Sequence, residues 1–567
     1  MLKNINLRSL TNSQDTISIS GAATYSQSGW SVSSIGDFNN DGYDDMIIGA
    51  PSASSGADYD SYTITGQSYI VYGTSSFTNI NLAHITEVEG FSIYLAYEYP
   101  TYSAKSGYSV RGAGDINNDG YSDIIIGAPL AGSAGSNMGV YGESYVVYGT
   151  ATLLSSINLA NLTAAQGFSI IGLYGCDNEF GYSVSGAGDI NNDGYSDIII
   201  GARQASSIGN YVGAYVVYGQ RSFPDTVYLA NITITQGFYT YGAGFGFYAV
   251  NGAGDINGDG YDDVIIGYVD SSSCSASSGN GCDGSAYVIY GNKSLPVAIN
   301  LKKIATDQYG FSMSGEAYSS CGYSVSSAGD MNNDGYGDVI IGAPYANSNE
   351  EGASYIVYGK YSMSYDTVSL IALTTTQGFT VNGDYAGSYL GLSVDNAGDV
   401  NNDGYDDIII GATSPELEYL FSGAVYVIYG ATSISSTINL ADLTATQGFS
   451  IIGDYAYGYS VSGAGDINKD GYDDLIIGVP DVEPCYEAIC TGSTYVVYGS
   501  SDSSESDDSS STSTTDDIGL ITGIAIGGAA VLGITGYALY AYTHDFWPFV
   551  GESLASKAAD HIGDTAL

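Results

Sequence analysis

The feature that most constrains this chain is a nine-residue acidic segment that occurs seven times. The first copy reads Asp37-Phe-Asn-Asn-Asp-Gly-Tyr-Asp-Asp45, and later copies begin at Asp115, Asp189, Asp255, Asp330, Asp399 and Asp466. The starts lie about 71 residues apart on average. Self-similarity at a fixed period is typical of repeat architectures, and propeller repeats span about 40–50 residues. We therefore predict seven equivalent units, with the extra length in loops.

Each unit contains four short strand-like runs, which are clearest in the third unit at 181–185, 197–201, 214–219 and 237–242. The runs are β-branched or aromatic, are bounded by glycine, and are too short for helices. Four strands repeated seven times predict an all-β fold, a seven-bladed β-propeller of four-stranded blades. A solenoid is the alternative, but it needs polar caps at its ends, and the sequence has none.

The two ends of the repeat array are offset by one strand. Segments that resemble the fourth strand occur at 17–21 and near Gly90, Gly167, Gly237, Gly310, Gly378 and Gly448. The first lies before the first acidic segment, and none follows the last third strand at 495–499. We therefore predict that the N-terminal strand completes the last blade, which removes two open sheet edges. One extra residue between Gly246 and Asp255 also predicts a β-bulge near Tyr248 or Ala249.

The acidic segment carries oxygen ligands at fixed spacing, which indicates a metal-binding loop. Oxygens at positions 1, 3, 5 and 9, with the carbonyl of position 7, can surround one hard cation, and Gly at position 6 permits a sharp turn. Three carboxylates held this close repel one another unless a cation neutralises them. Calcium fits because it takes about six to eight oxygens in flexible geometry, and the loop has no soft ligand for zinc or copper.

The pattern is distinct from an EF-hand, which has Glu at position 12 and flanking helices; here position 12 of the first copy is Ile48. A plain hairpin turn is the alternative, since Asn-Asp-Gly marks turns, but seven complete copies favour the metal loop. The candidate calcium ligands, in which each Tyr offers its carbonyl, are Asp37, Asn39, Asp41, Tyr43, Asp45, Asp115, Asn117, Asp119, Tyr121, Asp123, Asp189, Asn191, Asp193, Tyr195, Asp197, Asp255, Asn257, Asp259, Tyr261, Asp263, Asp330, Asn332, Asp334, Tyr336, Asp338, Asp399, Asn401, Asp403, Tyr405, Asp407, Asp466, Asn468, Asp470, Tyr472 and Asp474.

The residues around these loops resemble the FG-GAP repeat of the integrin α-subunit propeller. The Phe-Gly part is present at Phe180-Gly181 and Phe245-Gly246, with variants at 457–458 and 390–391. The Gly-Ala-Pro part is present at 49–51, 127–129 and 342–344, decays at 201–203, 411–413 and 478–480, and is lost at 267–269. The resemblance covers nearly all of 1–499, and it implies a seven-bladed propeller whose loops bind calcium.

The chain also departs from that family pattern. Integrins carry the loop in only some blades, whereas here every blade has one. The β-sandwich domains that follow the propeller in integrins and their juxtamembrane Gly-Phe-Phe-Lys-Arg segment are not found in this sequence. We therefore expect a standalone integrin-like surface propeller, with an integrin-type β subunit doubtful as a partner.

Strand order predicts two unlike faces. The acidic loops join first to second strands and lie on one face, while the variable loops at 51–67, 129–143, 413–423, 480–492, 94–106 and 172–180 lie on the other. Function concentrates in variable loops on a rigid scaffold, so we expect a protein or glycan ligand there. The candidate contact residues, which are ordinary loop tyrosines in the alternative interpretation, are Tyr59, Tyr62, Tyr97, Tyr99, Tyr102 and Tyr141.

The composition changes after Gly499. Residues 500–517 are rich in Ser, Thr and Asp and predict a flexible stalk. Residues 518–542 carry no charge over 25 positions and predict a transmembrane helix, with a buried helix as the alternative, followed by a short tail at 543–567. We expect a single-pass membrane protein with its propeller outside the cell. Residues 1–20 have no apolar signal-peptide core, so either the sequence lacks its true start or the C-terminal span is a tail anchor, which would reverse the expected compartment.

Cysteines and sequons fit an oxidising exterior. Cys274 with Cys282, and Cys485 with Cys490, are expected to close small loops, whereas Cys176 and Cys321 are left without assigned partners. Asn161, Asn231 and Asn292 lie in glycosylation sequons, which chance alone can supply in so polar a chain.

The net charge and the absence of catalytic motifs limit the functions that the sequence allows. The net charge of −49 excludes a nucleic-acid binder, because too few Lys and Arg are present to neutralise phosphates. We find no zinc-protease, nucleophile-elbow or phosphate-loop motif, so we do not expect an enzyme. The sequence favours a calcium-binding, membrane-anchored propeller in adhesion or ligand recognition. A structural coat protein and, less favoured, a hydrolase are the alternatives.

Overall fold

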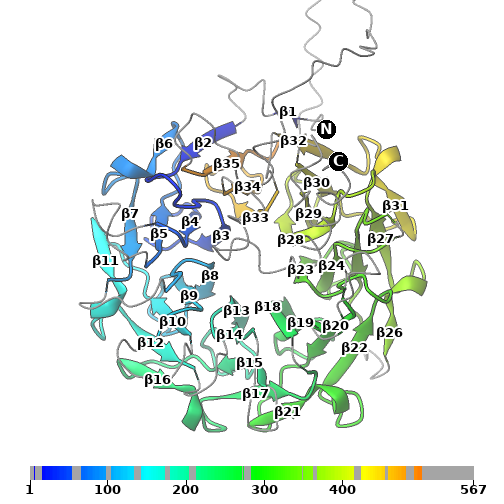
Figure 1. Cartoon of the computed structure of the whole chain (residues 1–567), viewed down its shortest axis with the longest axis horizontal. Coiled ribbons are helices and arrows are strands. Elements are labelled where there is room, and N and C mark those ends of the chain that lie inside the picture. Colours follow the sequence, from blue (N-terminus) through cyan, green and yellow to red (C-terminus); the bar gives the residue numbers. More distant parts are fainter. Residues whose placement is uncertain are drawn as a thin grey trace, which may run out of the picture. The chain divides into compact units, whose positions relative to one another are not determined.

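Seven β-sheets surround a common axis, which confirms the predicted all-β, seven-bladed propeller (Figure 1). The computed structural model describes residues 5–6, 16–53, 65–96, 104–132, 142–172, 179–203, 212–244, 246–270, 273, 282–347, 349–361, 367–413, 423–453, 458–480 and 491–500. The predicted membrane-spanning helix and tail lie outside these residues, as does the stalk beyond residue 500. Within the described part of the chain, no helix is long and apolar enough to cross a membrane.

The blades are numbered here after the acidic loop that each contains, and every blade has five strands. From the axis outward, blade 1 has β3 (Ser31–Gly36), β4 (Asp45–Ala50), β5 (Gln67–Val71), β7 (Gly90–Tyr94) and β11 (Ser156–Asn158). Blade 2 has β8 (Ser109–Gly114), β9 (Asp123–Ala128), β10 (Glu143–Val147), β12 (Gly167–Ile171) and β16 (Thr226–Tyr228). Blade 3 has β13 (Ser183–Gly188), β14 (Asp197–Gly201), β15 (Val212–Val217), β17 (Gly237–Tyr241) and β21 (Ala298–Asn300).

The remaining blades follow the same order. Blade 4 has β18 (Gly246–Gly254), β19 (Asp263–Asp270), β20 (Gly284–Ile289), β22 (Gly310–Ser314) and β26 (Val368–Ser369). Blade 5 has β23 (Ser324–Gly329), β24 (Asp338–Ala343), β25 (Ala353–Val357), β27 (Gly378–Asn382) and β31 (Thr437–Asn439). Blade 6 has β28 (Leu390–Gly398), β29 (Asp407–Ala412), β30 (Ala424–Ile428), β32 (Gly448–Ile452) and β1 (Ile5–Asn6). Blade 7 has β33 (Ser460–Gly465), β34 (Asp474–Val479), β35 (Ser493–Val497), β2 (Thr16–Ser20) and β6 (Ile80–Asn81).

The second strand of each blade explains the apolar runs in the sequence. In β9, all six residues of Asp-Ile-Ile-Ile-Gly-Ala are buried. A strand covered on both faces reads as a continuous hydrophobic run rather than as an alternating one. The blades pack face to face, so each apolar side chain of this strand lies between its own sheet and a neighbouring one.

The predicted closure by the N-terminus is confirmed. Strand β2 is antiparallel to β35, with Thr16 opposite Val497 and Ser20 opposite Ser493. The N-terminal segment does more than was predicted, because β1 also pairs in parallel with β32 of blade 6, with Ile5 opposite Ile451. Two neighbouring blades therefore each receive a strand from the start of the chain.

The prediction of four-stranded blades was wrong, because each blade carries a fifth, outer strand. This strand comes from the following repeat and pairs in parallel with the fourth strand, as β11 does with β7. A Leu directly after this strand begins a short 3-10 helix, and in three cases the side chain of the preceding Asn caps that helix. These helices are η2 (Leu82–His84), η3 (Leu159–Asn161), η4 (Leu229–Asn231), η6 (Leu301–Lys303), η7 (Leu370–Ala372) and η8 (Leu440–Asp442). The repeated Ile-Asn-Leu triplet was the available signal for this strand.

The glycines of the Phe-Gly and Gly-Ala-Pro parts meet across blade boundaries. A Cβ on Gly127 of blade 2 would lie 2.0 Å from the carbonyl oxygen of Gly181 in blade 3. Gly181 itself has φ +83 and donates its N–H to the carbonyl of Gly201 at 3.1 Å. The two motif glycines are therefore needed together, because each lets the backbone of the next blade approach.

The β-bulge predicted in the first strand of blade 4 was wrong. No bulge lies near Tyr248 or Ala249, since β18 pairs residue for residue with β19 from Gly246 to Gly252. The extra residue instead lengthens the strand to nine residues. A register shift at a comparable place occurs in blade 6, between Leu390 and Ser393.

The described cysteines only partly test the disulfide predictions. Cys282 is disulfide-bonded, and its predicted partner Cys274 lies outside the described residues, as do Cys485, Cys490 and Cys176. Cys321 is buried with a free thiol. The sequon residues Asn161, Asn231 and Asn292 are exposed, and whether they carry glycans stays a prediction.

Candidate metal centre

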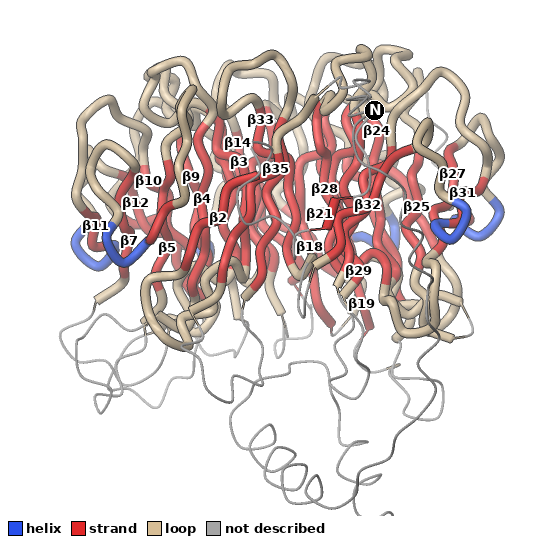
Figure 2. Tube along the Cα trace, turned by 90° about the horizontal axis from the view of Figure 1, so that it is seen from above, coloured by secondary structure: helices blue, strands red, loops and turns tan. Residues whose placement is uncertain are grey.

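The seven acidic loops lie between the first and second strands of the blades, at one end of the propeller. Figure 2 shows the strands running between two faces of loops. Each acidic loop follows a glycine with positive φ at a register shift, as at Gly114, where φ is +68 and the pairing jumps from Gly112 to Gly114. A glycine in the left-handed region is typical of such a bulge, which bends the chain out of the sheet. The nine loop residues then return the chain to the second strand.

Loop 2, residues 115–123, shows the arrangement within one loop. Asp115 accepts backbone N–H bonds from Asp119 at 3.0 Å and from Gly120 at 2.8 Å. The Asp119 carboxylate accepts from the backbone of Tyr121 at 3.1 Å and from the Asn117 side-chain amide at 2.9 Å. Positions 1, 3 and 5 are thus brought together, as the sequence analysis predicted, and the chain wraps around them.

The position-3 asparagines test whether the loop suits a cation. The side-chain oxygens of five of them are buried and have no hydrogen-bond partner: Asn117, Asn191, Asn257, Asn332 and Asn401. In the other two loops, this oxygen accepts the backbone N–H of position 5, as Asn39 does from Asp41 at 2.8 Å. A buried acceptor without a donor costs free energy. Its chemistry is that of a hard-cation ligand, so the residues fit the predicted calcium ion.

Position 9 has a second role that the sequence analysis did not foresee. Asp123 is fully buried, and its two oxygens accept the backbone N–H groups of Ile116 at 3.0 Å and Gly149 at 2.8 Å. Burial raises the pKa of Asp123 to about 8, the two backbone bonds oppose the rise, and the charges of Asp119 and Asp115 add to it. The other six loops repeat both bonds and the raised pKa. This carboxylate therefore joins the loop to the segment that follows the third strand of the same blade.

Among the residues that the structure describes, no three His, Cys, Asp or Glu side chains form a group ready to hold a metal ion. The predicted ligands of each loop are an Asn at position 3, a backbone carbonyl at position 7 and only three carboxylates, at positions 1, 5 and 9. Of these, the position-9 carboxylate is also engaged by backbone N–H groups. The loops thus bring the predicted residues together around one position.

Two further loop positions make contacts between neighbouring loops that were not predicted. In five loops the position-4 residue is an Asn that takes a left-handed conformation, as at Asn118 with φ +56, and donates a hydrogen bond to the next loop. Where position 8 is Asp, its carboxylate accepts the backbone N–H of position 1 in the preceding blade, as Asp262 does from Asp189 at 2.7 Å. The recurrence of Asn at position 4 in five loops was a visible signal.

At the opposite ends of the first strands, aromatic side chains pack around the axis. Trp30 contacts Tyr108 and Tyr459, with ring centroids 5.3 and 4.7 Å apart, and Tyr108 contacts Tyr182 at 4.9 Å. The Arg203 guanidinium lies 5.5 Å from the centre of the Tyr182 ring and pairs with Glu179 at 3.2 Å. These rings belong to the face opposite the acidic loops, because they precede the strands that lead to those loops.

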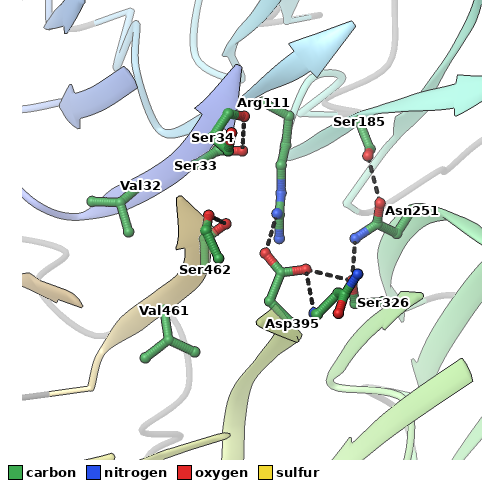
Figure 3. A network of polar contacts seen from close by, with 12 residues as sticks. Val32, Ser33, Ser34, Arg111, Ser185, Asn251, Ser326, Asp395, Val461 and Ser462 are labelled. Carbon is green, nitrogen blue, oxygen red and sulfur yellow. Dashed lines mark hydrogen bonds and ion pairs between the residues drawn. The ribbon is translucent and has the colours of Figure 1, made fainter. Parts of the chain in front are cut away.

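A polar network lies between these two ends of the first strands (Figure 3). Arg111 of blade 2 forms an ion pair with Asp395 of blade 6. Asp395 also accepts from Ser326 at 2.5 Å, Ser326 accepts from Asn251 at 2.8 Å, and Asn251 accepts from Ser185 at 2.6 Å. One residue at the same strand position from each of blades 2 to 6 therefore joins a single chain of bonds.

The predicted contact tyrosines Tyr59, Tyr62, Tyr97, Tyr99, Tyr102 and Tyr141 lie outside the described residues. The separation of the two faces is confirmed where the structure describes it. Gly149, just after the third strand, bonds to the acidic loop of its own blade, whereas Ser106 and Thr65, from loops assigned to the other face, bond to each other at 2.9 Å.

Comparison with known proteins finds FG-GAP repeats and integrin alpha relatives, in agreement with the resemblance seen in the sequence. The FG-GAP repeat family matches residues 28–71, 106–147, 180–218, 322–357, 390–428 and 457–484. These segments lie in six of the blades; blade 4, where Tyr248 rather than a motif glycine faces Gly201 of blade 3, is outside them. The chain is 33% identical to integrin alpha-6 of Gallus gallus over 162 residues, which are 28% of this chain and 13% of that protein. It is 26% identical to integrin alpha pat-2 of Caenorhabditis elegans over 328 residues, 56% of this chain and 25% of that protein. The chain therefore spans a quarter or less of the length of these relatives.

Proposed function

Because the chain is an FG-GAP repeat protein with an integrin-alpha-like propeller, we propose that it is a calcium-binding recognition protein of the cell surface. In this proposal, each acidic loop holds one calcium ion, and the opposite face recognises a protein or glycan ligand. The predicted helix at 518–542 anchors the chain in the membrane, and the propeller is extracellular.

The observation that carries the calcium part is the set of buried, unpartnered Asn side-chain oxygens. Five loops of one fold repeat the same unmet acceptor beside two carboxylates, and chance does not repeat a costly feature in this way. Positions 1, 3 and 5 would hold the ion, together with the position-7 carbonyl and the free lone pairs of position 9. The ion would supply charge neutralisation, and the chain's own residues would fix the loop around it.

The recognition part is supported by the difference between the two faces. The acidic loops repeat one structure, so they offer little variety for a specific ligand. The opposite face combines loops of unlike length with a half-buried aromatic group at the axis, formed by Trp30, Tyr108, Tyr182 and Tyr459. Aromatic side chains provide large contact areas with few rotatable bonds, which suits a binding surface.

Two measurements test the proposal with the full chain. Calcium titration followed by calorimetry should give a stoichiometry near seven ions per chain, the number of loops. A protein and glycan array screened with and without chelator should then give specific binding that calcium removal weakens. A stoichiometry of zero would overturn the calcium part. Calcium binding without any ligand on the array would instead favour a structural coat, and substrate turnover would favour a hydrolase.

A further inference from the structure

Neighbouring acidic loops are joined to one another directly. The position-4 side-chain amide donates to the backbone carbonyl of the position-6 glycine in the next blade. Four of these bonds measure 2.7–2.9 Å, from Asn118 to Gly194, Asn192 to Gly260, Asn333 to Gly404 and Asn402 to Gly471. A fifth, from Asn40 to Gly120, is longer at 3.5 Å. Loops on different blades are thus linked by side chains that lie between predicted calcium ligands.

We call the contact between the acidic loops of two adjacent blades a seam. Backbone and carboxylate hydrogen bonds strengthen several of these seams. Between loops 6 and 7, the Asp399 N–H donates to the Asp473 carboxylate at 2.8 Å, and the Asp473 N–H donates to the Asp399 carbonyl at 3.3 Å. Together with the bond from Asn402, this seam has three bonds. The seam between loops 7 and 1 closes the ring with a bond of 3.1 Å from Asp466 to Asp44, and Lys469 lies 5.4 Å from the centre of the Tyr43 ring.

The seam between loops 4 and 5 lacks this side-chain link. Position 4 of loop 4 is Gly258, and the Tyr336 ring of blade 5 lies where a side chain would begin, 2.4 Å from an ideal Cβ. The bond that the structure gives between these two loops runs from the Gly337 N–H to the Asp255 carbonyl at 3.1 Å. The molecule therefore contains linked seams and a natural comparison seam.

The position of these bonds allows the ordering of one loop to affect its neighbour. Position 4 lies between the ligands at positions 3 and 5, and position 6 lies between the ligands at positions 5 and 7. When the backbone of one loop is fixed around an ion, both ends of the seam bond are held in place. A neighbouring loop that is already ordered loses less conformational entropy on binding its own ion, which produces positive cooperativity.

We propose that the position-4 side chains are positioning residues that couple the calcium sites of adjacent blades. The coupled series runs from loop 5 through loops 6, 7, 1, 2 and 3 to loop 4, and it is interrupted between loops 4 and 5. This inference rests on the proposed function, because it concerns how the loops share calcium binding.

The test reads each loop separately in the full chain by hydrogen–deuterium exchange over a series of calcium concentrations. Asp403→Ala removes a carboxylate of loop 6, and protection of loop 7, residues 466–474, is measured. We expect the calcium midpoint of loop 7 to rise at least about threefold. In the Asn402→Gly background, the same Asp403→Ala change should shift the loop 7 midpoint much less. Such a cycle isolates the coupling of the pair.

Asn402→Gly suits this purpose because φ at Asn402 is +56, a conformation that glycine adopts without strain. The matched control is Asp259→Ala in loop 4, which should leave the midpoint of loop 5, residues 330–338, nearly unchanged. If Asn402→Gly unfolds the chain, Asn118→Gly with Asp119→Ala, read at loop 3, provides the same cycle.

The possible outcomes separate this inference from the proposed function. Equal shifts of loop 7 in both backgrounds, or a shift of loop 5 as large as that of loop 7, would overturn the coupling and leave calcium binding intact. Wild-type loops whose protection does not respond to calcium would overturn both. A shift of loop 7 that depends on Asn402, with no shift of loop 5, would support the coupling.

Discussion

The two faces of the propeller are built by the same strands, yet one is regular and the other is not. On the acidic-loop face, position 9 makes the same pair of backbone bonds in each of the seven blades. At the opposite end, the residue seven positions before the acidic loop is Trp30 in blade 1, Leu392 in blade 6 and Tyr in the others. One face is thus fixed by local chemistry, whereas the other varies on a constant scaffold. Four predictions test whether the two faces are as independent as this difference implies.

The largest effect should come from calcium removal, which addresses the regular face alone. Each ion held at a hundred times its dissociation constant stabilises the folded chain by about 2.7 kcal/mol, since the unfolded chain scarcely binds it. We expect excess chelator to lower the melting temperature by many degrees, measured by differential scanning calorimetry. An unchanged melting curve would show that the loops are ordinary turns.

Asp197→Ala should destabilise the protein whether or not calcium is present. The substitution leaves the buried N–H groups of Ile190 and Gly219 without acceptors, which costs about 2 to 6 kcal/mol. Urea denaturation with and without chelator measures it. Asp193→Ala is the matched control, because Asp193 is exposed and its loss should matter only when calcium is bound. Equal calcium dependence of the two variants would contradict the structural role of position 9.

Arg111→Ala tests the polar network that lies around the axis, between the two faces. Arg111 pairs with Asp395, whose side chain is only 7% exposed, and removing one partner of such a pair leaves a buried charge, at a cost of about 3 kcal/mol. Denaturation midpoints provide the measurement. The double variant Arg111→Leu with Asp395→Leu should recover most of the loss, and a double variant as unstable as the single one would point to a different origin.

The smallest effect is expected on the variable face. Tyr182→Leu keeps an apolar side chain but removes the ring under Arg203, at a cost of about 1 kcal/mol. Thermal unfolding should show a small loss that chelator does not change. A large loss of calcium affinity in this variant would mean that the two faces are not independent.

Much of the architecture could be predicted because a repeat shows its own period. Seven acidic segments gave the number of blades, and the strand-like segment at 17–21 led to the correct closure through β2. The fifth strand was missed, because Ile157 and Asn158 form too short a run to read as a strand. It exists only because strand β7 of the preceding blade offers a free edge. The error at Tyr248 has a similar cause, since an added residue can bulge or extend a strand, and only the pairing partner decides.

For the candidate site, the sequence alone determined which residues gather, because nine consecutive residues contain positions 1, 3 and 5 and the glycine that turns them. It also fixed the alternation of apolar runs and turns that makes a propeller. The tertiary structure decided what no single repeat contains. Loops touch only when blades stand side by side, so the bonds from Asn118, Asn192 and Asn402 to the next loop depend on the closed ring. The ion pair of Arg111 and Asp395 joins strands 284 residues apart for the same reason.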